Sequence, residues 1–399
     1  MSRSPLSLRS PRPSPLACLP ALLGAIAVAV LAGCAAPPVG MAPAPAPAPV
    51  PVPGPAPAAP KALVIGHRGA SALRPEHTLA SYERAIEDGA DVVEPDLVMT
   101  RDGVLVARHE NEIGTTTNVA ELPQYASRKR IKVIDGERLD GWFTEDFTLA
   151  ELKTLRARER IPQLRQANTR YNDQFEIPTF DEIIEMVARA SQRSGRVIGL
   201  YPETKHPSYF RSIGLPLEEK LVATLRAHAY TRSAPVFVQS FETGNLRELH
   251  RRLGGSMPNV KLVQLMGGAR SRPADWRLAG DTRTFADMMT PIGLREVASY
   301  ASGIGPEKSS VVPLDANGNL GAPSALVHNA HAAGLLVHPY TFRPENRFLP
   351  RNLRTGGDDA TRSPAGMVRE VQAFLAAGID GFFTDDPALG RQAVDTLGH

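Results

Sequence analysis

Strand-like apolar runs alternate with amphipathic helical patterns from residue 61 to residue 399, and this alternation constrains the fold more than any other feature of the chain. Strands that alternate with helices pair in parallel, which leaves a doubly wound sheet or a (β/α) barrel. The length of this stretch suits one large α/β barrel better than two ordinary domains. We expect strands near 62–66, 91–98, 104–109, 196–202, 235–240, 260–266, 335–341 and 379–384, and helices at 78–89, 179–193, 216–229, 243–253, 323–333 and 363–377.

One junction departs from this alternation. Only residues 100–103 separate the runs 91–98 and 104–109, which is too short for a crossover helix. Asp102-Gly103 is a turn signal, so one interpretation is a hairpin and the other is a local irregularity of a barrel. We favour the irregularity. A short run near 302–305 also competes for a strand position.

Residues from about 110 to 178 form a long insertion, in which a helix is predicted at 148–157. Long loops in compact barrels are usually functional. Because the insertion follows the run that carries His109, we expect it to cap the catalytic face. A peripheral excursion is the alternative.

The first 33 residues are typical of an export signal, since three arginines precede an apolar stretch at 16–31. The ending Leu31-Ala32-Gly33-Cys34 resembles a bacterial lipobox, which implies cleavage before Cys34 and lipidation of its thiol. An ordinary signal peptide with an incidental cysteine, or a short membrane anchor, is the alternative. The other cysteine, Cys18, lies in the signal, so we expect no disulfide in the mature chain.

Residues 34–60 are rich in proline and alanine and predict a semi-rigid tether. Without the signal, Lys+Arg falls from 45 to 42 against 42 Asp+Glu, so nucleic-acid binding through a basic surface loses its support. We expect the lipid to be the only membrane contact of the domain at 61–399. The expected location is the periplasmic side of a bacterial envelope, and Ala35 fits the outer membrane if the source is Gram-negative.

Three acidic residues lie at or near the ends of strand-like runs. Glu94 and Asp96 are two apart in a strand and point to the same face, where two carboxylates repel each other unless a cation lies between them. Glu203 can supply a third oxygen. An all-oxygen ligand set favours Ca²⁺ or Mg²⁺ over Zn²⁺. The alternative is an ion pair with Arg68 or Lys205.

Two histidines and two cations complete the candidate set. His67 and Arg68 follow the run 62–66, and His109 ends another run. A guanidinium fork matches a phosphate, and Lys205 adds a second positive charge for its oxygens. Two imidazoles from different strands can form an acid/base pair near neutral pH. Taken alone, however, a histidine at a strand end is more often a hydrogen-bonded structural residue.

Several other residues have both a functional and a structural interpretation. Phe241, His338 and Tyr340 are candidates for the pocket wall, and core packing is the alternative for each. His206 follows Lys205 and fits a solvated rim position. Asp385 either bonds to the pocket or begins the next helix.

Taken together, these residues resemble the glycerophosphodiester phosphodiesterase family, particularly its bacterial periplasmic and lipoprotein members. The resemblance covers essentially all of 61–399. It is carried by Gly66–Ser71, Pro75–Leu79, Glu94–Thr100, Tyr201–Lys205, Gly303–Pro306, Val337–Thr341 and Phe383–Asp385. The chain departs from many members in having Glu110 in place of Asp, and His338-Pro339-Tyr340 where a Trp is common.

The resemblance implies a TIM (β/α)8 barrel with a capping insertion after an early strand. It also implies hydrolysis of glycerophosphodiesters to sn-glycerol 3-phosphate and an alcohol, with one divalent cation, Ca²⁺ before Mg²⁺. The implied roles are metal binding for Glu94, Asp96 and Glu203, acid/base catalysis for His67 and His109, phosphate binding for Arg68 and Lys205, and support for Glu76.

The preferred head group, the acid and base roles of the two histidines, and the nucleophile, water or the substrate 2-hydroxyl, stay open. One rival is phospholipase-like action on intact lipids, which the charged insertion, including Arg128–Arg130, does not favour. The other is an envelope binding lipoprotein without catalysis, because a barrel fold alone does not make an enzyme.

Overall fold

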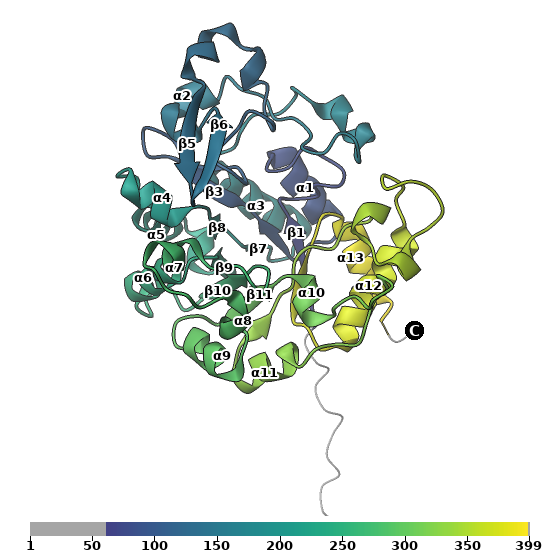
Figure 1. Cartoon of the computed structure of the whole chain (residues 1–399). Helices are drawn as coiled ribbons and strands as arrows, with labels where there is room; N and C mark the ends of the chain where they lie inside the picture. Colours follow the sequence, from purple (N-terminus) through teal and green to yellow (C-terminus); the bar gives the residue numbers. More distant parts are fainter. Residues whose placement is uncertain (1–60, 398–399) are drawn as a thin grey trace, which may run out of the picture. The chain divides into compact units, whose positions relative to one another are not determined.

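Parallel strands arranged around a common axis form the centre of the structure, a computed structural model that describes residues 61–397 (Figure 1). Neighbouring strands pair around the sheet. At the remaining junction, between its two end strands, the backbone N–H groups of Asp380 and Phe383 donate to Val337 O (3.0 Å) and Pro339 O (3.1 Å). The expected TIM barrel is confirmed. In ring order its strands are β1 (Leu63–His67), β2 (Val92–Glu94), β7 (Gly199–Leu200), β9 (Val236–Ser240), β10 (Val260–Met266), β11 (Gly303–Pro306), β12 (Leu336–Val337) and β13 (Gly381–Thr384).

Two of these strands are interrupted at prolines, which have no N–H to donate to a ladder. Pro95 separates β2 from β3 (Asp96–Met99), and Pro202 separates β7 from β8 (Glu203–Thr204). β3 pairs in parallel with β8 and antiparallel with β4 (Leu105–Ala107). The junction at 100–103 is therefore a hairpin, and our preference for a barrel irregularity there is wrong. The run near 302–305 supplies a ring strand instead.

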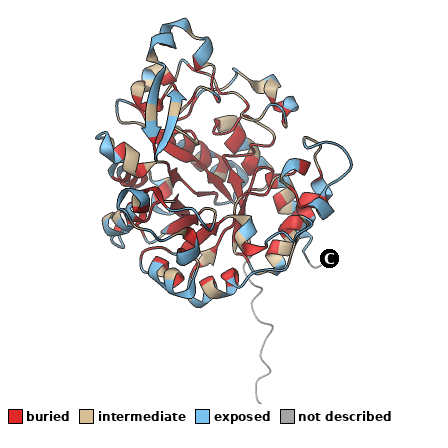
Figure 2. Ribbon diagram, viewed as in Figure 1, coloured by how far each residue is buried: buried red, intermediate tan, exposed pale blue. Residues whose placement is uncertain are grey.

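Helices cover the outside of the ring, and the strands inside are buried (Figure 2). Thr179 and Glu182 form a capping box at the start of α3. The α-helices are α1 (Leu79–Glu87), α2 (Leu149–Leu152), α3 (Phe180–Ser194), α4 (Pro207–Ser212), α5 (Leu217–Ala227), α6 (Thr243–Leu253), α7 (Ala274–Leu278), α8 (Phe285–Met288), α9 (Pro291–Ala298), α10 (Lys308–Val311), α11 (Leu326–Ala332), α12 (Pro364–Ala376) and α13 (Pro387–Asp395). The 3₁₀ helices are η1 (Val119–Glu121), η2 (Pro123–Arg128), η3 (Thr144–Asp146), η4 (Gln166–Tyr171), η5 (Tyr230–Arg232), η6 (Asn346–Phe348) and η7 (Arg351–Leu353).

The barrel interior is packed with side chains, as is usual for this fold. A cluster separate from the main core joins Ile65, Val92, Val263 and the aromatic rings of Tyr201, Phe237 and Phe383. Tyr201 stacks on Phe237 with ring centroids 4.9 Å apart. This cluster closes the floor beneath the polar strand ends.

The insertion at about 110–178 carries the antiparallel hairpin of β5 (Arg130–Ile134) and β6 (Glu137–Gly141), beside α2 in Figure 1. The helix predicted at 148–157 is shorter than expected, since α2 ends at Leu152. At the hairpin turn, Asp135 lies 2.6 Å from Nδ1 of His206, which places this turn beside the strand-end face of the barrel.

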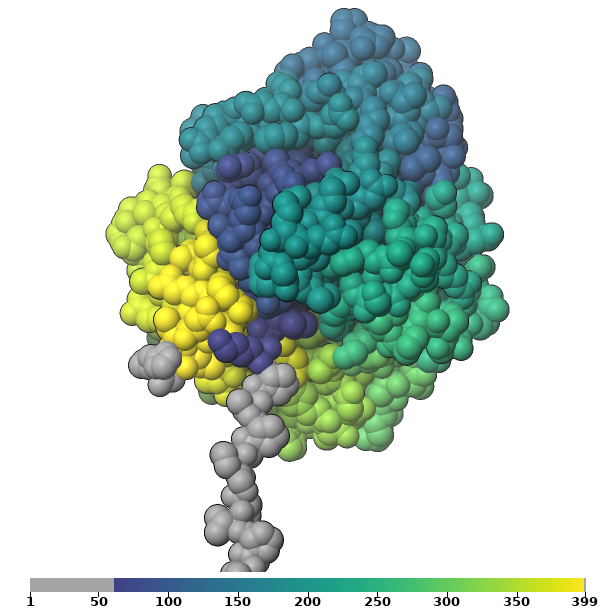
Figure 3. Space-filling model, turned by 180° about the vertical axis from the view of Figure 1, so that it is seen from behind, coloured from purple at the N-terminus to yellow at the C-terminus, as the bar shows by residue number. Residues whose placement is uncertain are grey.

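The C-terminal helix α13 lies beside the first described segment of the chain, as seen from behind in Figure 3. Arg391 donates to Asp91 (3.0 Å), and Lys61 donates to Asp395 (3.1 Å). Within 61–397, no helix has the length and apolar character that crossing a membrane needs. The predicted signal, the tether and Cys34 lie outside the described residues.

Candidate active site

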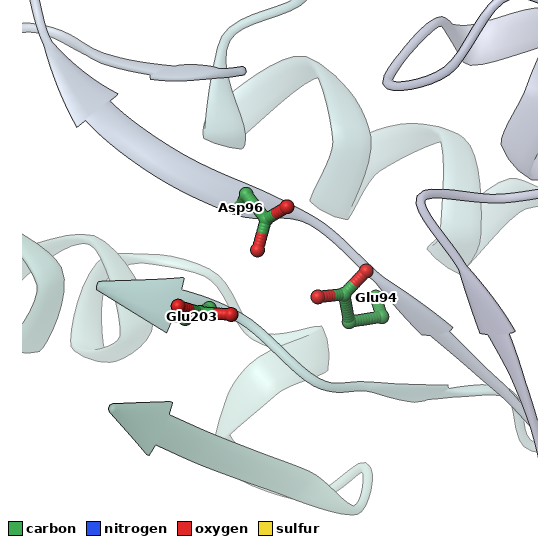
Figure 4. Close-up of side chains that lie close together, drawn as sticks. All are labelled: Glu94, Asp96 and Glu203. Carbon is green, nitrogen blue, oxygen red and sulfur yellow. The ribbon is translucent and has the colours of Figure 1, made fainter. Parts of the chain in front are cut away.

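Three carboxylates meet at the strand ends of β2, β3 and β8. Glu94 ends β2, Asp96 begins β3, and Glu203 begins β8, directly opposite Asp96 in the parallel register. Each is buried and offers one oxygen that lies within 4.8 Å of the oxygens from the other two (Figure 4). The structure thus brings together the three ligands predicted from the sequence.

The three carboxylates carry like charges and therefore repel one another. Burial, with Asp96 and Glu203 nearby, raises the pKa of Glu94 well above its usual range, and burial raises the pKa of Glu203 to about 8. Burial also acts on Asp96, but Lys205 and His77 outweigh it and lower the pKa of that carboxyl. Asp96 Oδ1 has no hydrogen-bond partner among residues 61–397. A divalent cation between the three carboxylates would relieve both the repulsion and this open oxygen, so the residues fit such an ion.

Arg68 connects this cluster to the phosphate side of the site. Its backbone N–H donates to Glu94 (2.7 Å), its Nη1 donates to Glu76 (2.9 Å), and its Nε lies 3.6 Å from Asp96. Arg68 and Gly69 both have positive φ, and a Cβ on Gly69 would lie 2.4 Å from Ser81 Oγ. Glycine at this position therefore allows the tight turn that directs Arg68 into the site.

The two predicted histidines both face this site and both contact a carboxylate. His67 ends β1, and its Nδ1 lies 2.6 Å from Asp385. His109 follows β4, and its Nδ1 contacts Glu110. Burial is the main cause that lowers the pKa of His67 to about 4 and, together with Arg68 and Lys205, lowers the pKa of His109 to about 3. Without a bound diester, the pKa values of both imidazoles thus lie below the ordinary value of 6.5.

Lys205 lies between the carboxylates and the cavity. Its Nζ donates to Glu203 at 2.8 Å and lies 5.8 Å from the centre of the Phe241 ring. Although burial alone would lower the pKa of Lys205, Glu203 and Asp96 raise it, so the ammonium group stays charged. The site keeps a fixed positive charge beside the proposed ligands.

A cavity of about 360 Å³ opens over these groups. Phe241 and Tyr340 form part of its wall, as predicted, and their rings meet edge to face at 6.1 Å. His338 lies deeper, fully buried in the barrel interior, with Nδ1 2.9 Å from the Tyr201 hydroxyl, and it does not line this cavity. The described residues that line it are His67, Arg68, His109, Glu203, Lys205, Gln239, Phe241, Leu265, Glu307, Lys308, Ser309, Tyr340, Thr341, Arg343 and Phe383.

A second cavity, of about 340 Å³, shares Glu203, Lys205 and Tyr340 with the first and extends towards the hairpin turn at Asp135. His206, predicted as a rim residue, lines this extension. The site is therefore longer than the phosphate centre alone.

Sequence reasoning missed several residues that hold the site in place. His77 contacts Asp96, and Gln239 donates to Glu94 (3.1 Å). From the insertion, Arg160 donates to Glu76 and Arg165 donates to Asp385. His77 stands next to Glu76 in the motif Pro75–Leu79, so its position is a usable signal in the sequence. The two arginines carried no signal, because nothing in the insertion's sequence shows which carboxylates they meet.

The sequence profile of the glycerophosphoryl diester phosphodiesterase family matches residues 67–389. A glycerophosphodiester phosphodiesterase of Arabidopsis thaliana is 35% identical over 334 residues, which cover 80% of this chain and 82% of that protein. One of Haemophilus influenzae is 29% identical over 351 residues, covering 82% of this chain and 88% of that protein.

Two solved structures share the fold. A Silicibacter pomeroyi DSS-3 protein, provisionally named a glycerophosphoryl diester phosphodiesterase, has a TM-score of 0.59 at 20% identity and covers 85% of this chain and 95% of its own. An Oleispira antarctica phosphodiesterase in complex with the product sn-glycerol-3-phosphate has a TM-score of 0.51 at 21% identity, with coverage of 84% and 98%. With the profile match over most of the chain, the predicted enzyme class is confirmed: the chain belongs to the glycerophosphoryl diester phosphodiesterase family.

Proposed function

We propose that this protein hydrolyses glycerophosphodiesters to sn-glycerol 3-phosphate and an alcohol with the help of one divalent cation. The observation that carries the proposal is the convergence of three buried carboxylates, two imidazoles, Arg68 and Lys205 at one end of the barrel. Barrel enzymes place their reacting groups at this end of the strands. The product complex of the Oleispira antarctica phosphodiesterase, which shares the fold, supports the assignment of the product.

Glu94, Asp96 and Glu203 would hold the cation, and their all-oxygen ligand set favours Ca²⁺ or Mg²⁺. We place Ca²⁺ first, as the family resemblance implies. When bound, the cation neutralises phosphate charge and orients the diester. Arg68 and Lys205 carry the fixed positive charges on the protein side. Both point into the same cavity, so they share the charge that develops on the phosphate oxygens.

His67 and His109 divide the proton transfers between them. Each has Nδ1 against a carboxylate, which leaves Nε2 for the substrate. One imidazole is neutral and removes a proton from the nucleophile, either water or the substrate 2-hydroxyl. The other carries a second proton, on Nε2, when the anionic diester is bound, and it donates that proton to the leaving alcohol. A glycerophosphodiester that lacks the 2-hydroxyl separates the two nucleophiles, because it is cleaved only if water attacks directly.

A panel of substrates tests the proposed reaction against its rival. The purified protein is incubated with Ca²⁺ and glycerophosphodiesters of choline, ethanolamine, glycerol or inositol, and in parallel with two-chain phospholipid in mixed micelles. Products are identified by mass spectrometry. We expect sn-glycerol 3-phosphate and the free alcohol from at least one diester. Diacylglycerol or phosphatidic acid from the two-chain lipid, with the diesters untouched, would assign the protein to phospholipase-like action instead.

For the location, we propose a lipoprotein on the periplasmic side of a bacterial envelope, with its lipid on Cys34. The support is the sequence Leu31-Ala32-Gly33-Cys34 followed by the proline-rich stretch to residue 60. The test is expression of the full chain and of Cys34→Ala in a Gram-negative host with labelled palmitate. We expect label and membrane fractionation for the full chain only. Equal fractionation of both proteins would remove the anchor from the proposal.

A further inference from the structure

Arg160 and Arg165 of the insertion donate hydrogen bonds to the carboxylates that contact the two site histidines. Arg160 donates from Nη1 and Nη2 to the two oxygens of Glu110, at 3.1 and 2.7 Å, and Glu110 contacts Nδ1 of His109. The same guanidinium donates to both oxygens of Glu76, at 2.8 and 2.6 Å. Glu76 in turn accepts from Arg68. One side chain thus sets the positions of His109 and Arg68 together.

Arg165 makes a related contact at the other histidine, through a single hydrogen bond to its carboxylate. It donates to Asp385 Oδ2 at 2.6 Å, while Oδ1 of the same carboxylate lies 2.6 Å from Nδ1 of His67. It also donates to Glu345 (2.8 Å) and to the backbone oxygen of Ser71 (2.9 Å). Arg343 adds a second donor to Asp385, at 2.9 Å from Oδ2. Each imidazole therefore ends a chain of arginine, carboxylate and histidine, and both chains begin in one short stretch of the insertion.

A series of arginine, carboxylate and histidine fixes the orientation of the imidazole. A carboxylate against Nδ1 sets the tautomer and directs Nε2, but it does so only while its own plane is held. A guanidinium fork holds a carboxylate through parallel hydrogen bonds, which a lysine ammonium does not reproduce. Arg160 and Arg165 also line a cavity of about 290 Å³ together with His67, His109 and Asp385. Both chains thus face the reaction space.

We propose that Arg160 and Arg165 are positioning residues for both proton-transfer histidines, which makes the insertion a working part of the active site. This inference rests on the proposed function. The alternative is that the arginines only fasten the insertion to the barrel. Arg158 offers a matched control, since it lies in the same stretch and is about as exposed as Arg160. It pairs with Glu121 (2.6 Å) and Asp173 (2.8 Å), and within residues 61–397 neither carboxylate contacts a histidine.

The first experiment compares steady-state kinetics of Arg160→Ala, Arg165→Ala and Arg158→Ala on a diester that the wild type cleaves. We expect kcat to fall about 10- to 100-fold for the first two, as for misplaced catalytic groups, with KM changed far less. Arg158→Ala should retain wild-type kcat. Millimolar guanidinium should restore part of the kcat of the two affected variants and none for Arg158→Ala.

A substrate with a different leaving group distinguishes arginines that position the histidines from arginines that only attach the insertion to the barrel. The p-nitrophenyl ester of glycerol 3-phosphate needs no proton on its leaving group, so the histidine that acts as the acid is not required. We expect the loss to disappear with this substrate for one of the two arginine variants and to persist for the other. An insertion that is merely loosened would reduce the rates on both substrates equally in both variants, and that result would overturn the proposal.

Arg165 is buried, so Arg165→Ala can unfold the protein by leaving Asp385 and Glu345 without their partner. Arg165→Lys and Arg160→Lys keep the charge and lose the fork. For these variants we expect reduced kcat at unchanged melting temperature, and wild-type kcat would overturn the proposal. Wild-type protein without activity on any diester contradicts the proposed function itself, whereas active wild type with unaffected arginine variants contradicts only this inference.

Discussion

Nε2 of His77 lies 2.9 Å from Oδ2 of Asp96, while the other oxygen of that carboxylate, Oδ1, has no hydrogen-bond partner within residues 61–397. His77 is fully buried, and its Nδ1 lies 2.7 Å from the Tyr82 hydroxyl, so the imidazole is held from both sides. The arrangement turns one oxygen of Asp96 towards the protein and leaves the other for a ligand.

We predict that His77→Ala weakens Ca²⁺ binding about 10- to 100-fold, because a ligating carboxylate loses the partner that orients it. Calcium titration by calorimetry measures the effect. Glu94→Gln is the positive control, since it removes a proposed ligand. His331→Ala is the negative control, because His331 contacts Asp380 at 2.9 Å and no member of the carboxylate cluster. Unchanged Ca²⁺ affinity in both His77→Ala and Glu94→Gln would argue against the cluster as the metal site.

Removal of either site histidine should abolish turnover without unfolding the protein. For His67→Ala and His109→Ala we expect kcat to fall by about 10²- to 10⁴-fold, the usual contribution of a general acid or base. Circular dichroism and the melting temperature serve as checks on the fold. Near-wild-type turnover in either variant would show that the residue is wrongly assigned.

The turn after β1 gives a prediction about stability. Gly69 and Gly103 have φ of +89° and +77°, but a Cβ on Gly69 would meet Ser81 whereas one on Gly103 would have no atom within 4 Å. Gly103→Ala should cost about 1–2 kcal/mol from its backbone conformation alone. Gly69→Ala should cost a further amount of about 1–3 kcal/mol from the clash and should reduce activity, because Arg68 precedes it. Equal free energies of unfolding for the two variants, measured in urea, would contradict the close packing of the turn.

The acid limb of the pH profile should lie lower than for an ordinary histidine. Burial and Arg68 lower the pKa of His67 to about 4, from an ordinary value of 6.5, despite the opposing effect of Asp385. A lowered pKa keeps the imidazole neutral and able to accept a proton down to about pH 4. With His67 as the base, we therefore expect kcat/KM at saturating Ca²⁺ to fall on the acid side with an apparent pKa near 4. A limb near 6.5 that does not move when Ca²⁺ is doubled would refute this.

Much of the fold was predictable because strand and helix periods are local properties of the sequence. The spacing of Glu94 and Asp96 also places both on one face, even though Pro95 interrupts the strand between them. The hairpin at 100–103 was not predictable, because a four-residue connection fits either interpretation. The outcome depends on strand pairing in the tertiary structure, where β3 pairs with both β4 and β8. His338 shows the same limit: its position in a strand-like run was visible, but not that it faces Tyr201 below the cavity.

The contacts of the supporting arginines could not be predicted from the sequence, for a different reason. Arg160 meets Glu76 across 84 residues, and Arg165 meets Asp385 across 220. No periodicity relates such pairs, because a loop without regular structure is placed by the tertiary fold. The sequence shows that the insertion is rich in charge, and only the structure shows which charges meet.

The measurement that tests the central claim most directly is release of sn-glycerol 3-phosphate from glycerophosphocholine by the purified protein, first with EDTA and then with Ca²⁺ restored. We predict that EDTA abolishes release and that Ca²⁺ restores it, because the carboxylates of Glu94, Asp96 and Glu203 would hold the required cation. Release that persists after complete removal of metal would contradict a metal-dependent reaction. Absence of release from folded, calcium-loaded protein, with this and other common head groups, would contradict the proposed hydrolysis itself.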